Sequence, residues 1–474
     1  MKTKLADGTL IACAPIYAQD GDGTLVTLAY RRQSVVGSST LLGTLNLRFN
    51  IHLPPASPLG DAALAQGLIV AMAAATPLQV EAPVSARLLQ LSARYQEIHR
   101  AFFPDETIVP VQAPVAASAP PDPSRGVGAF LSNGIDSWHA ILKHRQEITH
   151  YIFILGFDVW LKHHAYAARA VTLARETAAK LGKPLIIVET NSFDFAHHFI
   201  PWPRDGHPLQ AAIGFLLSPL LSKIIIAADL PWQGLITGSE HPHLYEALRS
   251  DTFELQHSGS ASTRQEKVRG LCRQPEWLPY LRVCWDMPED RLNCGRCEKC
   301  LRTMVGLTIE GQLSQCPVLP PLDIELLKKL EYKATMSLFY EEFLEAATSR
   351  KDLPPDFVSA LRQCVERNRM NALVEQLKPY RKHLVQSLPY QQQEKKLRDR
   401  LFALFWESDS HWILKKLRRH SANYRQDLAK HLRKIAKHDL QRVQWRSRWK
   451  KFRALFHAGW WQRRNSDRRT DHPL

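Results

Sequence analysis

The stretch GVGAFLSNGIDS, from Gly126 to Ser137, places an apolar run, a polar turn and the start of a helix in direct succession. The apolar run is typical of a buried strand. In the turn, Gly134 permits close backbone approach, and N–H groups at the positive end of a helix dipole bind phosphate well. Ser132 and Ser137 add hydroxyl donors. A plain helix cap, with Asp136 or Ser132 capping and no ligand, fits the spacing equally well.

The same alternation of apolar runs and helical segments continues downstream. Strands are expected at residues 126–131, 151–155, 184–189, 223–228 and 234–237. Helices are expected at residues 136–143, 162–181 and 208–221. Continuously apolar strands between helices predict a parallel sheet covered on both faces. Residues 126–320 are therefore predicted to form a doubly wound, mostly parallel α/β domain. Ligands of such sheets lie beyond the carboxyl ends of the strands, which favours a phosphate site in the turn.

The flanking segments differ from this domain in composition. Residues 1–110 predict a small N-terminal α/β unit that carries no chemical motif, so packing or capping of a substrate is its expected role. Two strands that pair with each other are expected at 24–30 and 45–51, and helices at 61–75 and 84–103. Residues 111–125 are rich in Pro, Ala and Ser and predict a linker. Residues 321–474 predict a helical region that is strongly basic from about residue 378.

A second motif consists of cysteines with the spacing C-x9-C-x2-C-x2-C, at Cys284, Cys294, Cys297 and Cys300. Zn²⁺ prefers four tetrahedral ligands, and thiolates two residues apart fold readily around one ion. Gly295 allows the intervening turn, and neighbouring basic side chains offset the charge of the thiolates. An iron–sulfur cluster is the alternative metal centre, and buried free cysteines are the alternative without metal.

The turn resembles the Ser-Gly-Gly-x-Asp-Ser signature of the PP-loop ATP pyrophosphatases, which share the adenine nucleotide alpha hydrolase-like fold. The resemblance implies an adenylated intermediate, release of pyrophosphate, and an ATP site made of Ser132, Asn133, Gly134, Ile135, Asp136 and Ser137. Asp136 is expected to act through Mg²⁺ or to cap the helix. Asn133 stands where the family usually has glycine. Asn is the least costly replacement if a positive φ is needed there, but its side chain could crowd the phosphates and weaken or abolish ATP turnover.

The two motifs together are similar to the 7-cyano-7-deazaguanine synthase family, over roughly residues 126–305. That resemblance implies that the four cysteines hold zinc beside the active site. It also implies that Lys267, shortly before the first cysteine, lies in the active site, and Arg264 could face the phosphates with it. From the residues alone, Ser262 or Thr263 followed by Glu266 predicts a capped helix start, with a solvated helix end as the simpler interpretation.

A further segment near the expected carboxyl edge is Thr237-Gly-Ser-Glu-His241, which follows the strand predicted at 234–237. Gly238 and Ser239 are therefore expected to contact substrate or adenine. His163 and His164 could line the same edge, although surface histidines are the simpler interpretation. The spacing of the histidines at 241, 243 and 257 fits no compact metal site.

Positive charge is concentrated at the C-terminus. The chain carries a net charge of +16, and residues 376–474 contain 26 Lys/Arg against 8 Asp/Glu, so the remainder is close to neutral. Trp445, Trp449 and Phe452 fall on one face of an expected helix surrounded by basic residues. RNA or DNA binding and binding to an anionic membrane surface are the functional interpretations. The structural interpretation is an amphipathic helix that packs on the rest of the protein and leaves its basic face in solvent.

The expected compartment is the reducing cytoplasm. Cysteines that cluster in a large chain indicate metal binding more than a disulfide framework. Asp7 and Gly8 interrupt any apolar segment of a signal peptide, and no apolar run suits a membrane span.

Three functions are consistent with these patterns. The first is an ATP-dependent ligase or synthase that uses ATP, Mg²⁺ and Zn²⁺, with Lys267, Arg264 and Asp136 as catalytic residues. A small-molecule or protein carboxylate would become an acyl-adenylate and then an amide or nitrile, with release of AMP. The second is a PP-loop RNA-modifying enzyme of the thiolation type, which would use the basic region to hold tRNA. The third is a non-catalytic nucleotide-binding protein, in which Asn133 in place of glycine would indicate the loss of ATP turnover.

Overall fold

The structure is a computed structural model that describes residues 8–117, 120, 122–197, 199–200, 204, 206–238 and 240–386. The chain falls into two compact units, residues 1–365 and residues 366–474. The site discussed below lies in the first unit. Within the described ranges, no helix is both long and apolar enough to cross a bilayer.

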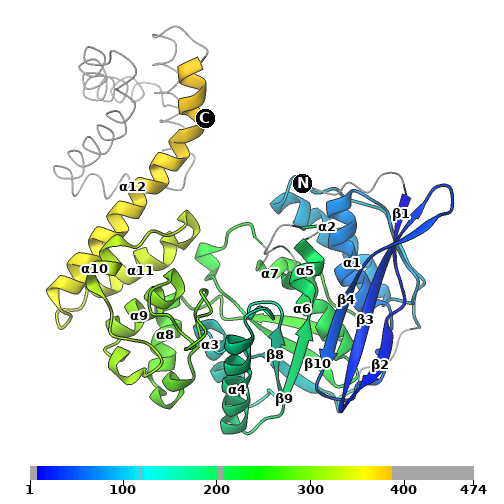
Figure 1. Ribbon diagram of the computed structural model, residues 1–474, viewed down its shortest axis with the longest axis horizontal. Helices are drawn as coiled ribbons and strands as arrows, with labels where there is room; N and C mark the ends of the chain where they lie inside the picture. Colours follow the sequence, from blue (N-terminus) through cyan, green and yellow to red (C-terminus); the bar gives the residue numbers. More distant parts are fainter. Residues whose placement is uncertain are drawn as a thin grey trace, which may run out of the picture. The chain divides into compact units, whose positions relative to one another are not determined.

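The first unit is built on one sheet of eleven strands with the order β11-β10-β7-β8-β9-β4-β3-β1-β5-β6, and β2 pairs with β3 (Figure 1). Neighbouring strands of its first half are parallel: β7 (Gly126–Phe130), β8 (His150–Leu155), β9 (Leu185–Thr190), β10 (Leu221–Ala227) and β11 (Glu254–Ser258). The chain proceeds from β7 outward to β8 and β9, then returns to place β10 on the other side of β7. The reversal between β7 and β10 is a topological switch point, where open α/β sheets bind ligands.

The second half of the sheet comes from the N-terminal residues. Its strands are β1 (Gly8–Ala12), β2 (Ile16–Asp20), β3 (Gly23–Ser34), β4 (Ser39–Phe49), β5 (Leu78–Val80) and β6 (Val111–Gln112). β4 pairs antiparallel with β9 through Leu47↔Thr190 and Phe49↔Val188, which joins the two halves. The expected pairing of the strands at 24–30 and 45–51 is confirmed in β3 and β4. The segment expected to be a linker contributes the short strand β6.

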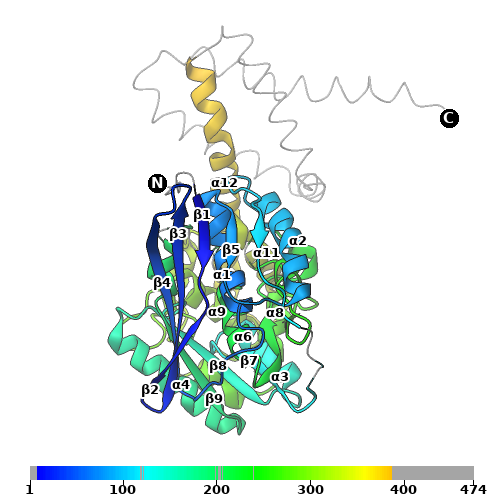
Figure 2. The same ribbon diagram turned by 90° about the vertical axis from the view of Figure 1, so that its right-hand side faces the viewer.

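Helices cover both faces of the sheet, as the apolar strands predicted. One face carries α3 (Ile135–His144) and α4 (His164–Leu181), and the other carries α1 (Asp61–Ala74), α2 (Ala86–Phe102) and α6 (Gly206–Leu216). Side chains of β8 alternate accordingly, because Ile152 packs with the second group while Tyr151 and Phe153 pack with the first. Figure 2 shows α1 and α2 on one side of the N-terminal strands. All of α1 is buried.

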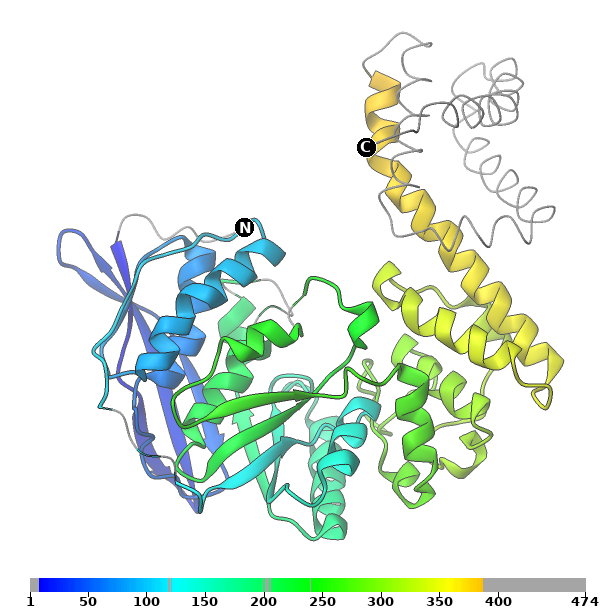
Figure 3. The same ribbon diagram turned by 180° about the vertical axis from the view of Figure 1, so that it is seen from behind.

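A helical region follows the sheet. It contains α8 (Arg264–Cys272), α9 (Glu298–Ile309), α10 (Ile324–Lys329), α11 (Ser337–Thr348) and α12 (Pro355–Gln386), seen from behind in Figure 3. Apolar side chains of α9, α10, α11 and the start of α12 form a core of their own. The shorter helices α5 (Ser192–His197) and α7 (Pro242–Glu246) lie between the strands in sequence. Most of the basic C-terminal region lies outside the described residues.

The strand predicted at 234–237 is wrong. A 3-10 turn, Trp232–Gly234, and an irregular loop occupy this segment. Its apolar residue Leu235 packs against the helical core, so the apolar run serves a different contact. The fifth parallel strand is β11, whose sequence ELQHS is mostly polar because an edge strand has a neighbour on one side only. The helix predicted at 208–221 ends at Leu216, where a turn leads into β10.

Candidate functional site

The turn between β7 and α3 lies at the switch point of the sheet. Asn133 adopts φ 60°, the left-handed conformation for which asparagine is the best substitute after glycine. Its side chain is buried, and Nδ2 donates to Thr177 Oγ1 at 2.8 Å and to the Tyr280 carbonyl at 3.0 Å. The side chain therefore ties the turn to α4 and to the segment that leads to Cys284.

Hydrogen bonds within the turn set its shape. Ser137 Oγ accepts from the Ser132 amide at 3.1 Å and donates to the Phe130 carbonyl at 2.9 Å. Ser132 Oγ accepts from the Gly134 amide at 3.3 Å. Gly134 is the N-cap of α3, and no side chain of the described residues caps this helix. The first turn of α3 thus keeps backbone N–H groups that a ligand could use.

Asp136, in the first turn of α3, is paired with two cations from α8. Its Oδ2 contacts Arg264 Nη1, and its Oδ1 lies 3.0 Å from Lys267 Nζ. Lys267 is 1% exposed and also donates to the Ala228 carbonyl at 2.5 Å. Burial by itself would raise the pKa of the Asp136 carboxyl, but the two cations outweigh it and hold that pKa well below its usual range. The three residues predicted as catalytic are thus brought together.

The start of α8 confirms the capping prediction. Thr263 is the N-cap: its side chain accepts from the Glu266 amide at 3.3 Å, and Glu266 Oε2 accepts from the Thr263 amide at 2.8 Å. This reciprocal pair fixes the helix start. Arg264 and Lys267 lie one turn apart, so both side chains reach the same side of the helix toward Asp136.

The structure adds residues that the sequence analysis did not select. Arg282 donates from Nη2 to the Ser132 carbonyl at 3.0 Å, and its own amide donates to the Asn133 carbonyl at 3.0 Å. Asp229 follows β10 as the turn follows β7. Burial raises the pKa of the Asp229 carboxyl, and the charge of Asp136 raises it further. No sequence motif includes Arg282 or Asp229, because only the tertiary structure brings them close to the turn.

Lys299 and Arg302 extend the positive cluster from α9. Lys299 Nζ lies 3.7 Å from the centroid of the Trp285 ring, and Arg302 is 5% exposed. Burial lowers the pKa of Lys299, and neighbouring guanidinium groups lower it further against the attraction of Asp158. These groups belong to Arg302, Arg282 and Arg264. The cations of α8, α9 and the Arg282 segment therefore surround one region and favour an anionic ligand there.

The four predicted cysteines lie together. Their Sγ atoms are all within 4.8 Å of one another, and the pairs Cys284–Cys297 and Cys294–Cys300 are both 3.9 Å apart. A tetrahedral zinc with Zn–S bonds of about 2.3 Å requires S···S separations of about 3.8 Å. The donor set therefore fits a single zinc ion, and among the described residues this is the one group that could hold a metal.

Local structure explains this convergence. Gly295 has φ 72° and its Cα packs against Pro320, where a side chain would collide, so the chain turns tightly between Cys294 and Cys297. Cys294 Sγ accepts from the Cys297 amide at 3.2 Å. Cys297 is the N-cap of α9, which places Cys300 in its first turn. Burial raises the pKa of the Cys294 thiol, and a bound cation would favour its thiolate form instead.

The turn and the cysteine cluster are neighbours in the structure. Arg282 contacts the turn two residues before Cys284 enters the cluster. Tyr166 donates to the carbonyl of Leu292, two residues before Cys294. The segment from Arg282 to Cys284 thus links the two motifs, and α9 carries both Cys300 and two of the cations, Lys299 and Arg302.

The other predicted residues that the structure describes lie outside the Asp136 cluster. Gly238 is in the loop after the 3-10 turn, and Ser239 lies outside the described residues. Gly238 therefore does not follow a strand, which corrects the expectation from the sequence. His163 is the N-cap of α4, and its ring lies tilted against that of Trp160, with 5.8 Å between the ring centroids. His241 caps α7.

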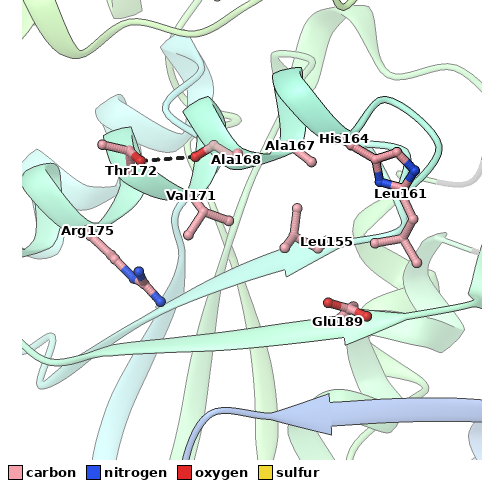
Figure 4. Close-up of a pocket in the computed structure, with 9 residues that line it drawn as sticks. All are labelled: Leu155, Leu161, His164, Ala167, Ala168, Val171, Thr172, Arg175 and Glu189. Atoms are coloured by element: carbon pink, nitrogen blue, oxygen red, sulfur yellow. Dashed lines mark hydrogen bonds between the residues drawn. The ribbon is translucent and has the colours of Figure 1, made fainter.

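His164 lines a groove between α4 and the strands β8 and β9, separate from the Asp136 cluster. The groove has a volume of about 580 Å³, and Figure 4 shows Val171 and Leu155 pointing into it. It is lined by Leu155, Leu161, His164, Ala167, Ala168, Val171, Thr172, Arg175 and Glu189. None of the other predicted site residues lines it.

Comparisons of the chain with models of protein families, with curated proteins and with solved structures find no match. The relationship to PP-loop enzymes therefore stays a prediction from the residues.

Proposed function

We propose that the protein is an ATP-dependent enzyme of the PP-loop type that adenylates a substrate carboxylate and forms an amide or nitrile, with release of AMP and pyrophosphate. One observation carries the proposal. Asp136 holds Arg264 and Lys267 beside the uncapped first turn of α3, at the switch point of a parallel sheet. This arrangement combines backbone N–H groups with buried cations, which is the combination that polyphosphate binding requires.

The residues have distinct roles in this proposal. Both carboxylate oxygens of Asp136 are already engaged, so its role is to orient Arg264 and Lys267, and Mg²⁺ would arrive with the phosphates of ATP. The two cations neutralise charge that develops on the leaving pyrophosphate. Asn133 does not oppose this role, because its side chain is turned away into hydrogen bonds with Thr177 and Tyr280.

The cysteine cluster supports the same proposal as a structural centre. Four thiolates fill a tetrahedral zinc site and leave no open position for a substrate. Zinc would fix the segment after Arg282 to the start of α9, and so hold Arg282, Lys299 and Arg302 around the anion site. The short Sγ–Sγ separations favour one ion over a cluster of several irons, which would hold the thiolates further apart.

The test is binding and turnover of ATP by the purified protein. Calorimetry should detect Mg·ATP binding, and a pyrophosphate assay with candidate carboxylic acids should detect turnover. Asp136→Asn and Asp136→Ala should weaken ATP binding about tenfold or more, because Arg264 and Lys267 lose the group that orients them. Asp122→Ala, at an exposed position ahead of β7 and outside the Asp136–Arg264–Lys267 group, is the matched control. Equal ATP affinity in all four proteins, or none in the wild type, contradicts the proposal.

A further inference from the structure

Helix α11 lies outside the segment that resembles PP-loop enzymes, yet it contacts the start of α8 directly. Glu342 Oε2 accepts from the Arg264 amide at 3.1 Å, and Glu342 Oε1 accepts from the Gln265 amide at 2.7 Å. The next amide, of Glu266, is taken by Thr263 in the capping box. The first N–H groups of α8 are therefore all bonded to protein atoms.

The same helix also touches the cations of the site. The Phe339 ring lies 5.8 Å from the Arg264 guanidinium and 4.7 Å from that of Arg302, so it packs against both. Tyr340 OH donates to Glu298 Oε1 at 3.1 Å, and Glu298 in turn lies 3.4 Å from Arg302 Nε. Helix α11 thus contacts the first turns of both α8 and α9, the helices that carry Arg264 and Arg302.

The two helix starts that face the site differ in one respect. The first turn of α3 has no side-chain cap, whereas Glu342 places a carboxylate on the first turn of α8. A carboxylate there satisfies the helix dipole and excludes a second anion from the same amides. An incoming phosphate would then meet α8 only through the Arg264 and Lys267 side chains.

We propose that Glu342 is a positioning residue of the anion site. It fixes the backbone at Arg264, so that the Arg264 and Lys267 side chains face Asp136, and it directs the anion to the first turn of α3. This inference rests on the proposed function because it takes ATP as the bound anion. The same role of Glu342 applies to any polyphosphate at this position.

The experiment measures binding of Mg·ATP and, separately, of inorganic pyrophosphate to the full chain. Glu342→Ala should weaken both about tenfold, and Glu342→Gln should recover part of the loss because an amide oxygen still accepts an N–H. Glu345→Ala, at an exposed position on the same helix, is the matched control and should bind as the wild type does. In an Arg264→Ala background, Glu342→Ala should cost less than about threefold, because the two residues act as one unit.

Each outcome decides a different point. If Glu342→Ala binds both anions like Glu345→Ala, or if its effect is undiminished in the Arg264→Ala background, the positioning role is overturned. Binding of pyrophosphate without ATP in the wild type would contradict the proposed function while the Glu342 comparison still holds for pyrophosphate. If the wild type binds neither anion, both ideas fail. Melting temperatures of all variants identify any that lose their fold. If Glu342→Ala does not fold, anion binding by Glu342→Gln is compared with that of the wild type instead.

Discussion

Asn133 combines a left-handed backbone, which glycine adopts most easily, with a side chain that forms hydrogen bonds. Its backbone takes the left-handed conformation, and its amide group gains two hydrogen bonds to residues 44 and 147 positions away in sequence. The Asn133 side chain therefore gives the turn a fixed connection to α4 that a glycine at this position would lack. The cost of a positive φ is smallest for asparagine among residues with a side chain.

The first prediction compares Asn133→Gly with Asn133→Ala. Both lose the hydrogen bonds to Thr177 and Tyr280, but alanine also pays for the left-handed conformation. The alanine variant should be less stable than the glycine variant by roughly 1–2 kcal/mol in denaturant unfolding. Mg·ATP affinity should not rise in Asn133→Gly, since the side chain points away from the turn. A large gain in affinity would mean that Asn133 does crowd the phosphates.

A second prediction concerns Asp61, the first residue of α1. Burial raises the pKa of its carboxyl to about 6, against hydrogen bonds from the Ser85 amide and hydroxyl. The native state therefore binds a proton more tightly than the unfolded chain, so the contribution of Asp61 to stability falls as pH rises through about 6. Asp61→Asn imitates the protonated form and lacks this dependence.

Unfolding free energies of wild type and Asp61→Asn, measured from pH 4 to pH 8, provide the test. As pH rises, the free energy of unfolding of Asp61→Asn should increase relative to that of the wild type by up to about 3 kcal/mol. The difference should level off above about pH 7. Other titrating groups cancel in this difference. A constant difference across the range would show that the carboxyl titrates normally.

At the scale of elements, the helix starts organise the site. α3 begins at the turn, α8 begins with its capping box, and α9 begins inside the cysteine cluster. Asp136, in the first turn of α3, pairs with Arg264 and Lys267 from the start of α8. The cysteine cluster is the element that holds α9 in this arrangement.

The third prediction tests that cluster. Purified protein should contain about one zinc per chain, and Cys297→Ser combined with Cys300→Ser should remove it, because two of four ligands are lost. Elemental analysis measures the metal content, and Cys272→Ser, a cysteine outside the cluster, is the control. Iron and sulfide in place of zinc would favour an RNA-thiolating enzyme. Zinc retained in the double variant would place the metal elsewhere.

For the whole molecule, the main feature is that the N-terminal residues complete one sheet with the parallel half. β4 pairs with β9, and the buried helix α1 packs on α6. Glu106 also contacts the parallel half, since Arg204 Nη1, from the segment between β9 and β10, lies 2.8 Å from Glu106 Oε1. The N-terminal segment therefore supports the face of the sheet opposite α3 and α4.

The fourth prediction concerns the basic C-terminal region, where the net charge of residues 376–474 is +18. Such an excess repels itself, and a polyanion would relieve the repulsion. The full chain should bind tRNA or anionic vesicles, with affinity falling at least tenfold between about 50 and about 200 mM salt. Deletion of residues 378–474 should abolish this binding and leave the zinc site intact. Binding of neither partner at low salt, or loss of zinc on deletion, would show that this region belongs to the core.

The sequence determined the local elements of the parallel half. Apolar runs marked β7, β8, β9 and β10, and the C-x2-C-x2-C spacing marked three of the four metal ligands. Thr263 and Glu266 marked the start of α8. These features depend on contacts between residues close in sequence, so their pattern is readable without the fold. β11 was not predicted, because an edge strand needs no continuous apolar run. A strand was wrongly predicted at 234–237, because an apolar run can also pack against helices.

Only the tertiary structure decided which groups meet. Strand order placed β10 beside β7, and this brought Asp136 to Lys267, 131 residues further along the chain. Glu342 reached the start of α8 across 78 residues. No local pattern encodes such contacts, because they depend on how helices pack on a sheet whose order is fixed by the whole chain. A lysine or glutamate alone in sequence is as consistent with a solvated surface as with a site, and burial beside a partner is what distinguishes the two.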